Sequence, residues 1–333
     1  MFWLIYKGFL IKPVFISFMK IKNALWLSPM EGVSDLGFRS VCVKRGADLT
    51  FTEMIRADAL VRNNKATIEL IDTFLKEVPT GLQLLASKPA TLEKALKMIS
   101  KKREEGDQRY LNIVCIDLNF GCPSKDVITK GAGPALLKRE QRMRDLLTKL
   151  KKESPVPCGM KMRLGLGTAD RRNKVYLRVV ELANEIGLDW ITVHPKTADK
   201  NSFDPLDLDA LREILAIAKV PIIGNGFVKD GKSAKHFFDM GCSGVMIARS
   251  AIVNPWIFEE IKEYLRTGKV SRRDKDYAAA LAEYEYIAIQ YNAKDKFLTY
   301  HRKTFMDHVH GKLGYHSPNK RKKWVGTSNE KYK

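Results

Sequence analysis

The sequence predicts a (β/α)8 barrel followed by a smaller helical domain. Short apolar runs rich in β-branched residues alternate with longer amphipathic stretches, which is the pattern of strand and helix units around a parallel sheet. Eight such units occupy about 230 residues, as in a closed barrel, whereas an open doubly wound sheet usually has fewer strands. After residue 262 the alternation ends, and the remaining chain has a helical pattern, many tyrosines and an excess of basic residues.

The predicted strands end in polar residues and glycines. In chain order, the strands are expected at residues 24–30, 48–54, 81–86, 113–119, 158–163, 190–194, 220–224 and 244–248. The carboxyl ends of the strands form the active-site rim of such a barrel, so we expect the side chains there to meet. They are Pro29, Glu31, Glu53, Gln83, Asn119, Cys122, Lys161, Arg163, His194, Asn225, Gly226 and Arg249.

Three segments are expected along the chain: an N-terminal extension over 1–20, the barrel over 21–262 and a basic helical domain over 263–333. Lys7, Lys12 and Pro13 interrupt the apolar extension, so it lacks the roughly 20 apolar residues of a membrane span. No cleavage site of a signal peptide follows it. Met19 is an alternative start, and the sequence leaves both starts open. The final residues, KRKKWVGTSNEKYK, are expected to be partly disordered.

The chain carries a large positive charge. A formal net charge of +20 predicts a polyanionic partner, nucleic acid in the first place and anionic lipid in the second. A solvated lysine-rich surface is the alternative. The five cysteines are odd in number, scattered and without C-x-x-C spacing, which argues against a disulfide framework and against a zinc site. We therefore expect a reducing, cytoplasmic setting and no metal.

One cysteine stands in a constrained turn. In DLNFGCPSKD, residues 117–126, Cys122 precedes Pro123, and a proline fixes its own φ and keeps the preceding residue extended. A thiol held in this way is a proton donor or a nucleophile, but a nucleophile needs an adjacent base, and no histidine is near in sequence. At an ordinary pKa of about 8.5 the thiol is mostly protonated at pH 7, which favours proton donation. Small buried hydrophobic residues are expected at Cys115, Cys158 and Cys242.

Several motifs in a fixed order resemble the tRNA-dihydrouridine synthases, in an archaeal-like form of the pattern. The most specific is N-x-G-C-P followed by G-A-x-x-x-L-L, in DLNFGCPSKDVITKGAGPALL, whereas G-N-G and G-V-M-I-x-R are shared with other flavin barrels. The resemblance covers residues 27–258 well and the tail loosely. The other motifs are LSPMEGVSDLGFR, TEMI, QLLAS, KMRLG, TVHPK, PIIGNGFVKDG and GCSGVMIARSAIVNPWIF.

The resemblance implies a barrel with a C-terminal helical bundle and an FMN-dependent reduction of specific tRNA uridines to 5,6-dihydrouridine. Reduced flavin would deliver a hydride to C6 of the uracil, and Cys122 would deliver a proton to C5. NADPH or NADH would reduce the flavin between turnovers. A uridine inside folded tRNA must leave its stack to reach the flavin. A cytoplasmic monomer without membrane contact is expected.

The same resemblance implies which residues bind each ligand. Lys161 would face the N1 and C2 carbonyl region of the flavin, and the loops after the last two strands would hold its phosphate. Gln83 and Asn119 would offer amide groups to the flavin ring or to the base. The implied flavin contacts are Pro29, Met30, Gln83, Lys161, His194, Asn225, Gly226, Ala248 and Arg249. The implied substrate contacts are Asn119, Arg163, Lys196, Arg302 and Lys303, with Lys320, Arg321, Lys322 and Lys323 as further phosphate contacts.

The sequence departs from the family pattern at two places. His194-Pro195-Lys196 stands where the family often has H-x-R, so a point charge replaces a planar fork and a phosphate or base contact at position 196 is in question. Ser28 stands where alanine is usual, which should be tolerated. Two other functions stay open, a reductase of free pyrimidines like the dihydroorotate dehydrogenases and a tRNA-binding barrel without activity. The basic tail disfavours the first, and the intact Cys122 and Lys161 disfavour the second.

Overall fold

The computed structural model describes residues 21–201, 203–271 and 274–312 with their side chains. Outside these ranges it gives the backbone of two short antiparallel pairs, β1 (Leu4–Tyr6) with β2 (Phe9–Ile11) and β12 (Tyr315–His316) with β13 (Lys323–Trp324). The predicted extension over 1–20 and the predicted phosphate contacts over 320–323 lie outside the residues described with side chains.

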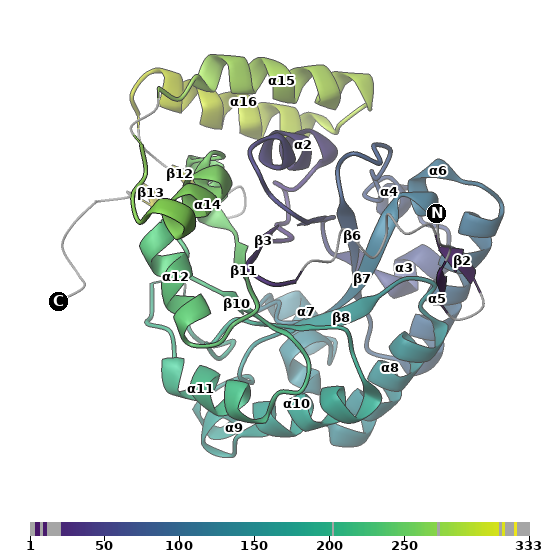
Figure 1. The fold of residues 1–333 in the computed structure, drawn as a ribbon. Helices are drawn as coiled ribbons and strands as arrows, with labels where there is room; N and C mark the ends of the chain where they lie inside the picture. Colours follow the sequence, from purple (N-terminus) through teal and green to yellow (C-terminus); the bar gives the residue numbers. More distant parts are fainter. Residues whose placement is uncertain are drawn as a thin grey trace.

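A closed parallel barrel forms the body of the molecule (Figure 1). Its sheet order is β3-β11-β10-β9-β8-β7-β6-β4, with β5 pairing beside β6. Backbone bonds from Leu27 N to Leu49 O (2.8 Å) and from Asp48 N to Leu25 O (2.9 Å) join the two ends of this order and close the barrel. The strands are β3 (Ala24–Leu27), β4 (Thr50–Phe51), β5 (Ile55–Arg56), β6 (Thr80–Leu85), β7 (Ile113–Phe120), β8 (Cys158–Met162), β9 (Ile191–Val193), β10 (Ile222–Asn225) and β11 (Gly244–Ile247).

The predicted fold class is confirmed, and a strand occupies each of the eight predicted regions. Several observed strands end earlier than predicted. β3 stops at Leu27, since Pro29 has no N–H to donate to a neighbouring strand. The second predicted strand, 48–54, contains only β4, and β5 begins just after it; both pair with β6. The residues left over at these ends form the loops of the barrel mouth.

Helices cover the outside of the barrel (Figure 1). Their starts follow ordinary capping chemistry: Asp35 accepts from Phe38 N at the start of α2, and Asp230 and Ser233 form a capping box on α12. The helices are α2 (Leu36–Lys44), α3 (Ala57–Val61), α4 (Lys65–Ile68), α5 (Pro89–Glu104), α6 (Gln108–Leu111), α7 (Lys125–Thr129), α8 (Glu140–Glu153), α9 (Thr168–Arg172), α10 (Val175–Ile186), α11 (Leu208–Ile217), α12 (Gly231–Asp239), α13 (Arg249–Val253) and α14 (Ile257–Thr267), with a 3-10 turn, η1, at Gly133–Leu136.

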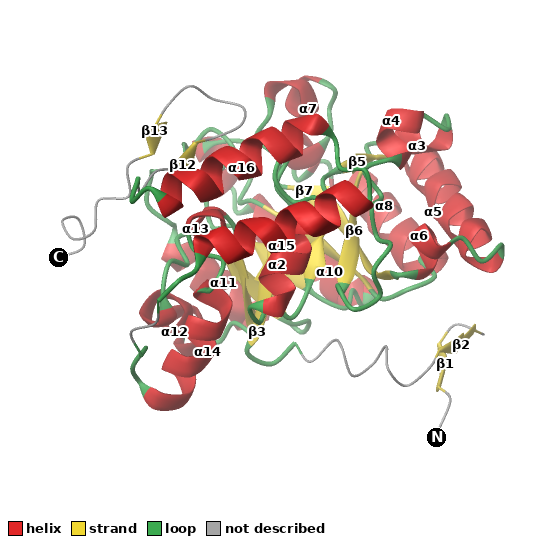
Figure 2. Cartoon of the chain, turned by 90° about the horizontal axis from the view of Figure 1, so that it is seen from above, coloured by secondary structure: helices red, strands yellow, loops and turns green. Residues whose placement is uncertain are grey.

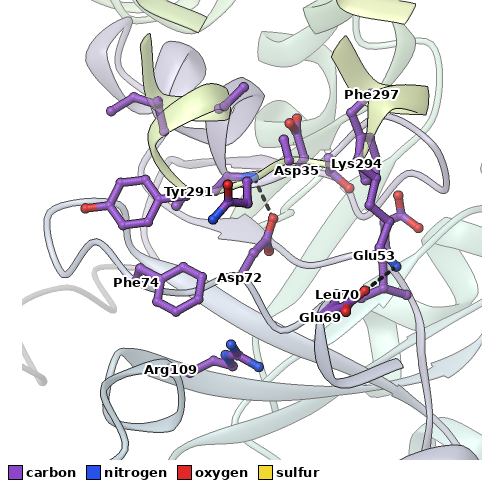
Figure 3. Close-up of a pocket in the computed structure, with 17 residues that line it drawn as sticks. Asp35, Glu53, Glu69, Leu70, Asp72, Phe74, Arg109, Tyr291, Lys294 and Phe297 are labelled. Atoms are coloured by element: carbon purple, nitrogen blue, oxygen red, sulfur yellow. Dashed lines mark hydrogen bonds and ion pairs between the residues drawn. The ribbon is translucent and has the colours of Figure 1, made fainter. Parts of the chain in front are cut away.

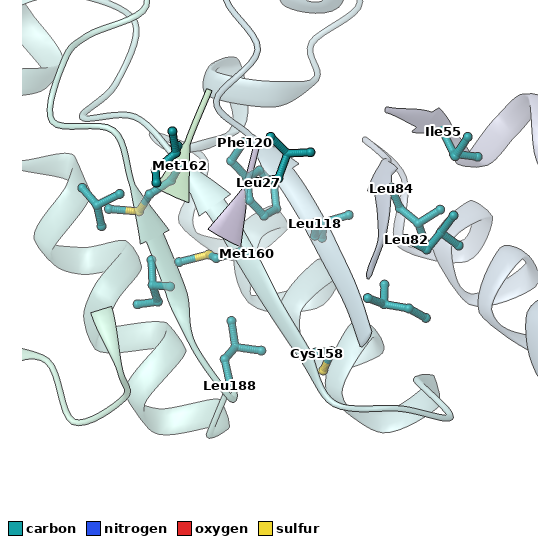
Figure 4. Close-up of a cluster of buried hydrophobic side chains, with 14 of the residues drawn as sticks. Leu27, Ile55, Leu82, Leu84, Leu118, Phe120, Cys158, Met160, Met162 and Leu188 are labelled. Atoms are coloured by element: carbon teal, nitrogen blue, oxygen red, sulfur yellow. The ribbon is translucent and has the colours of Figure 1, made fainter. Parts of the chain in front are cut away.

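Alternation along the strands divides the core into two layers. Side chains pointing outward from the strands, such as Leu118, Phe120 and Met160, pack under the helices (Figure 4). Inward-pointing aromatic residues fill the lower barrel, where Trp26 meets Trp190 edge-on at 5.5 Å between ring centroids. Successive strand residues face opposite sides, so Asp117 and Asn119 share the inward face of β7 with buried Cys115. The barrel interior is therefore apolar at one end and polar toward the mouth.

Two further helices, α15 (Tyr277–Gln290) and α16 (Asp295–Val309), lie together against α2 (Figures 1 and 2). They follow α14, the last helix of the βα series, through the segment around residue 270. The domain boundary at residue 262 remains a prediction. Among the residues that the structure describes, none of the helices combines the length and apolar composition needed to cross a bilayer.

Candidate active site

Strand register brings the predicted site residues to one end of the barrel. Asn119 of β7 pairs with Lys161 of β8, and Met162 of β8 pairs with Val193 of β9, directly before His194. Asn225 of β10 pairs with Met246 of β11. Most of the predicted mouth residues are partly exposed, although they lie at or just beyond the ends of largely buried strands. They are Pro29, Met30, Cys122, Lys161, Arg163, His194, Gly226, Ala248 and Arg249.

The turn that carries Cys122 is held from two sides. Asn119 Oδ1 accepts hydrogen bonds from Gly121 N and Cys122 N, both at 3.0 Å. From the opposite side, Arg163 Nε donates to Gly121 O at 3.0 Å, and its Nη1 donates to Thr197 O at 2.9 Å. These bonds add to the restraint of the following proline. The backbone of Cys122 is therefore held in place at the rim.

The Cys122 thiol differs from the other four. Cys42, Cys115, Cys158 and Cys242 are buried, as predicted for three of them, and Cys122 is partly exposed. Burial raises the pKa of the Cys122 thiol, and the negative charge of Glu31 raises it further, while the Ser124 amide, Lys161 and Arg163 oppose the rise. With its pKa above the ordinary value, the thiol keeps its proton at neutral pH. It is suited to donate a proton rather than to attack as a thiolate.

A buried chain of side chains supports this turn from below. Asn119 Nδ2 donates to Gln83 Oε1 at 2.8 Å, and Gln83 Nε2 donates to Asp117 Oδ2 at 2.7 Å. Gln83 and Asp117 are 1% and 0% exposed, and burial raises the pKa of Asp117 to about 7. The amides of Asn119 and Gln83 are thus already bonded to each other and to the turn, so the contacts with a flavin ring or base expected of them remain predictions.

Four cations converge on His194 at the mouth. Burial, followed by the charges of Arg163, Lys161, Lys196 and Arg249, holds the pKa of His194 well below its ordinary value. Burial also lowers the pKa of Lys161 and of Lys196 to about 8, with help from the neighbouring arginines. The mouth is therefore strongly electropositive, and its positive charges repel one another. An anion bound there would reduce the repulsion between these cations and would raise their lowered pKa values.

Lys196 occupies the position where the family pattern differs. It is 3% exposed, its ammonium lies 4.2 Å from the centre of the Phe227 ring, and Nζ donates to Asn201 O at 3.4 Å. Phe227 has a positive φ of 52°, an uncommon backbone state that turns the loop after β10 toward this lysine. Lys196 thus adds one positive charge to the electropositive mouth, but it lacks the planar guanidinium group of an arginine.

The loops after β10 and β11 have the geometry of a close-approach site. Gly226 has φ of 120°, and a Cβ there would lie 3.0 Å from His194 Cδ2, so no larger residue fits. Asn225 Nδ2 donates to Met246 O at 2.8 Å, which ties the two loops together. Ala248 and Arg249 begin α13 beside them. The four residues predicted for a phosphate are therefore neighbours, although no structural observation tests a phosphate contact.

Arg302 and Lys303 lie on α16 and not in the mouth. Arg302 Nε is paired with Glu285 of α15, and Lys303 Nζ lies 3.4 Å from Asp307 of the same helix. Both side chains are about half exposed. Their predicted role as substrate contacts would therefore require a ligand that extends from the barrel mouth to the helical pair.

A cavity of about 230 Å³ lies between the barrel and the helical pair (Figure 3). Its wall includes Asp35, Glu53, Asp72, Phe74 and Tyr291, and the rings of Phe74 and Tyr291 stack at 5.4 Å. Cys122, Lys161 and His194 are not part of its lining. The cavity is thus separate from the chemical groups of the mouth, although Glu53 was predicted at the rim.

Sequence reasoning missed several residues that support the site. Asp117 interrupts an apolar strand with a charge, and this was the signal available for it in DLNFGC. The structural use of Arg163, which holds backbone carbonyls on two loops, had no signal in the sequence because its partners are main-chain atoms. The contacts between α16 and the loop after β3 had no signal in the sequence either.

Comparison with known proteins agrees with the motif order and the barrel. The sequence profile of "Dihydrouridine synthase (Dus)" matches residues 26–329, which is most of the chain. The chain belongs to the dihydrouridine synthase family. Among curated relatives, the tRNA-dihydrouridine synthase B of Pseudomonas syringae pv. tomato is 34% identical over 251 residues, 75% of this chain and 71% of the relative. The proteins of the same name from Klebsiella pneumoniae and Escherichia coli K12 are 32% and 30% identical, over 77% and 75% of this chain and 76% and 75% of theirs.

These relatives of the dihydrouridine synthase family correct one expectation. They come from bacteria, so the archaeal-like form of the pattern is not supported. Among solved structures, morphinone reductase in complex with tetrahydroNAD is similar, with a TM-score of 0.47 and 13% identity, over 78% of this chain and 90% of that one. At this level the likeness adds nothing to the family assignment.

Proposed function

We propose that this protein reduces the C5=C6 bond of specific uridines in tRNA to 5,6-dihydrouridine, with FMN as its cofactor and NADPH or NADH as the electron donor. The observation that carries the proposal is a partly exposed thiol, whose pKa burial raises, at a mouth where four cations surround His194. The names of the curated relatives support the same activity.

The residues of the mouth fit a flavin mononucleotide. Lys161, Arg163, Lys196 and Arg249 supply positive charge, and a bound anion would offset the burial and repulsion that lower the pKa of both lysines. Lys161 would face the part of the flavin that becomes negative on reduction, and Gly226 and Arg249 would hold the phosphate. Pro29 and Met30 would border the ring. The bound flavin would supply the hydride for C6 of the uracil.

Cys122 would supply the proton for C5. A general acid must hold its proton at the working pH and lie close to the acceptor, and the raised pKa of this thiol supports the first condition. Asn119 and Arg163 fix the turn, so they would act by positioning the sulfur rather than by touching the base. Asp117 and Gln83 would support Asn119 in the same way. In this proposal the buried hydrogen-bonded side chains act by orienting the thiol of Cys122.

Binding of the tRNA would use the positive charge of the chain. The target uridine must leave its stack to enter the mouth, and contacts with phosphates would offset that cost. Arg302 and Lys303 on α16 would contribute such contacts. A monomer in the cytoplasm completes the proposal, and both features rest on the reasoning from the sequence.

A direct assay tests the function. The purified protein is incubated with FMN, NADPH and tRNA from a strain that lacks it, and dihydrouridine is mapped by mass spectrometry. We expect a gain of two mass units at defined uridines, since two hydrogens are added. Turnover of a free pyrimidine but not of tRNA would support the pyrimidine reductase instead. A protein that stays colourless after addition of FMN yet binds tRNA would support the barrel without activity.

A further inference from the structure

Helix α16 contacts the loop after β3 through a buried histidine. His301 is 0% exposed, its ring stacks on Phe38 at 4.8 Å, and its Nε2 lies 2.8 Å from Val33 O. A carbonyl oxygen only accepts, so Nε2 carries the hydrogen of this bond. The other ring nitrogen, Nδ1, is buried and has no hydrogen-bond partner among the described residues. The bond to Val33 is thus the main polar interaction of this side chain.

A second contact joins the same loop to the same helix. Glu53 Oε1 accepts from Gly32 N at 2.8 Å, and its Oε2 lies 3.7 Å from Lys296 Nζ of α16. Gly32 has φ of 76°, so the loop bends sharply where its amide is held. The Glu53 side chain is 5% exposed and that of Lys296 is 52% exposed. Glu53 is therefore a buried link between the loop and a helix at the surface.

Helix α15 holds the end of the loop. Asp35, the N-cap of α2, accepts from Tyr284 Oη at 3.1 Å and from Phe38 N at 3.3 Å. His301 Nε2 lies 3.5 Å from Asp35 Oδ1, the oxygen that also accepts from Phe38 N, whereas Tyr284 donates to Oδ2. Next to these contacts the junction is hollow, because the cavity of about 230 Å³ separates the barrel from the helical pair (Figure 3). These bonds add to the burial of Val33 and Ser34, which are 1% and 0% exposed, in positioning residues 32–35.

The other end of this loop lies at the mouth. It carries Pro29, Met30 and Glu31, and Glu31 affects the pKa of both Cys122 and Glu53. The charge of Glu31 therefore acts on both the thiol and the carboxylate that Lys296 contacts. A shift of the loop away from α16 would move these three residues relative to the sulfur.

We propose that His301 is a positioning residue for the reaction, which holds the loop after β3 in place through Val33, and that the helical pair is thereby part of the active site. Glu53 and Lys296 hold the same loop through Gly32. The consequence for turnover rests on the proposed function. The placement of the loop does not rest on the proposed function, because it can be measured without substrate.

Exchange of the backbone amides with deuterium, followed over residues 31–35, tests the placement. His301→Met removes the bond to Val33 O while filling the space, and His301→Gln keeps an N–H at a similar reach. His308→Met is the matched control, because His308 lies on the same helix, is buried and stacks on Tyr277 at 4.7 Å. We expect about tenfold faster exchange in His301→Met, as for the loss of one buried hydrogen bond, and little change in the other two. Lys296→Met, at the surface, should speed exchange at Gly32 without touching the core.

Steady-state kinetics then distinguish a role of His301 in positioning the loop from a role in the stability of the fold. Buried His301 does not touch tRNA, so His301→Met should lower kcat about tenfold and change the KM for tRNA by less than about twofold. His301→Gln should restore kcat. Unchanged exchange in both His301→Met and Lys296→Met, or equal effects in His308→Met, would overturn the proposal. Wild-type protein that fails to make dihydrouridine would count against the proposed function alone, because the exchange result needs no turnover.

Discussion

Whether the Cys122 thiol acts as an acid or as a nucleophile depends on how the neighbouring groups shift its pKa. Its pKa is raised chiefly by burial, and the positive charges of Lys161 and Arg163 are not enough to reverse this. A reactive nucleophile needs the opposite balance, with a lowered pKa and an adjacent base. His194 is the nearest histidine in the mouth, but burial and the surrounding cations lower its pKa, so it is a poor acceptor for the thiol proton. The side chains around the sulfur thus favour proton donation.

Loss of the thiol should stop the reaction without loss of the flavin. In Cys122→Ala we expect dihydrouridine formation to fall by about 10² to 10⁴-fold, the usual contribution of a general acid. The flavin absorbance and its reduction by NADPH should remain. Cys42→Ala is the control, because Cys42 is fully buried between α2 and the barrel. If Cys122→Ala formed dihydrouridine at the rate of the wild type, the role of Cys122 as the acid would be excluded.

The pKa of the thiol should respond in opposite directions to two neighbouring charges. Glu31 raises the pKa of Cys122 and Lys161 lowers it. Glu31→Gln removes a negative charge, so the thiolate forms at lower pH. Lys161→Met removes a positive charge, so it forms at higher pH. The pH dependence of iodoacetamide labelling measures both shifts, since Cys122 is the partly exposed cysteine. Shifts in the same direction would show that the charges act through the fold and not directly.

At the scale of elements, the sequence predicted the barrel strands well because buried parallel strands are short apolar runs with polar ends. The strand ends were predicted less well. Ser28 and Arg163 continue the sequence pattern of a strand, yet β3 ends at Leu27 and β8 at Met162. The mouth residues followed from the barrel topology, which places all carboxyl ends on one side. The bonds that orient them did not, because Gly121 O, Val33 O and Gly32 N are main-chain atoms with no mark in the sequence.

The junction of α2 with α15 should be intolerant of a single methyl group. A Cβ on Gly37 would lie 2.8 Å from two ring carbons of Tyr284 and 3.1 Å from its carbonyl oxygen. Overpacking costs about 1–3 kcal/mol and the better helix propensity of alanine returns about 1 kcal/mol, so we expect Gly37→Ala to destabilise the protein by up to about 2 kcal/mol. Thermal unfolding measures the loss.

A second substitution shows whether this loss comes from the contact itself. Tyr284→Leu is destabilising alone, because it removes the ring and the bond to Asp35. Combined with Gly37→Ala, it should make the glycine substitution less costly than in the wild type, since the ring no longer collides with the new methyl group. Strictly additive losses would mean that the two helices relax apart without strain.

At the scale of the whole molecule, the charge is divided between two tasks. The cations of the mouth are few, partly buried and close to one another, as a small anion requires. Many other basic side chains are exposed, and several of them already pair with carboxylates, as Arg302 does with Glu285. Among the residues that the structure describes, basic side chains thus also lie away from the mouth, as those of Arg302 and Lys303 on α16 do. Such a distribution suits a large polyanion whose phosphates are widely spaced.

Salt should therefore separate the two ligands. Binding of tRNA releases counterions from each contacted phosphate, so the logarithm of its affinity should fall steeply and linearly with the logarithm of salt concentration. FMN has a single phosphate, and it would bind among partly buried cations that salt screens less, so its affinity should change little. Filter binding for tRNA and flavin fluorescence for FMN, both between 50 and 300 mM KCl, measure the two slopes. Arg302→Gln should reduce the slope for tRNA alone, and a slope for FMN as steep as that for tRNA would show that one shared surface binds both.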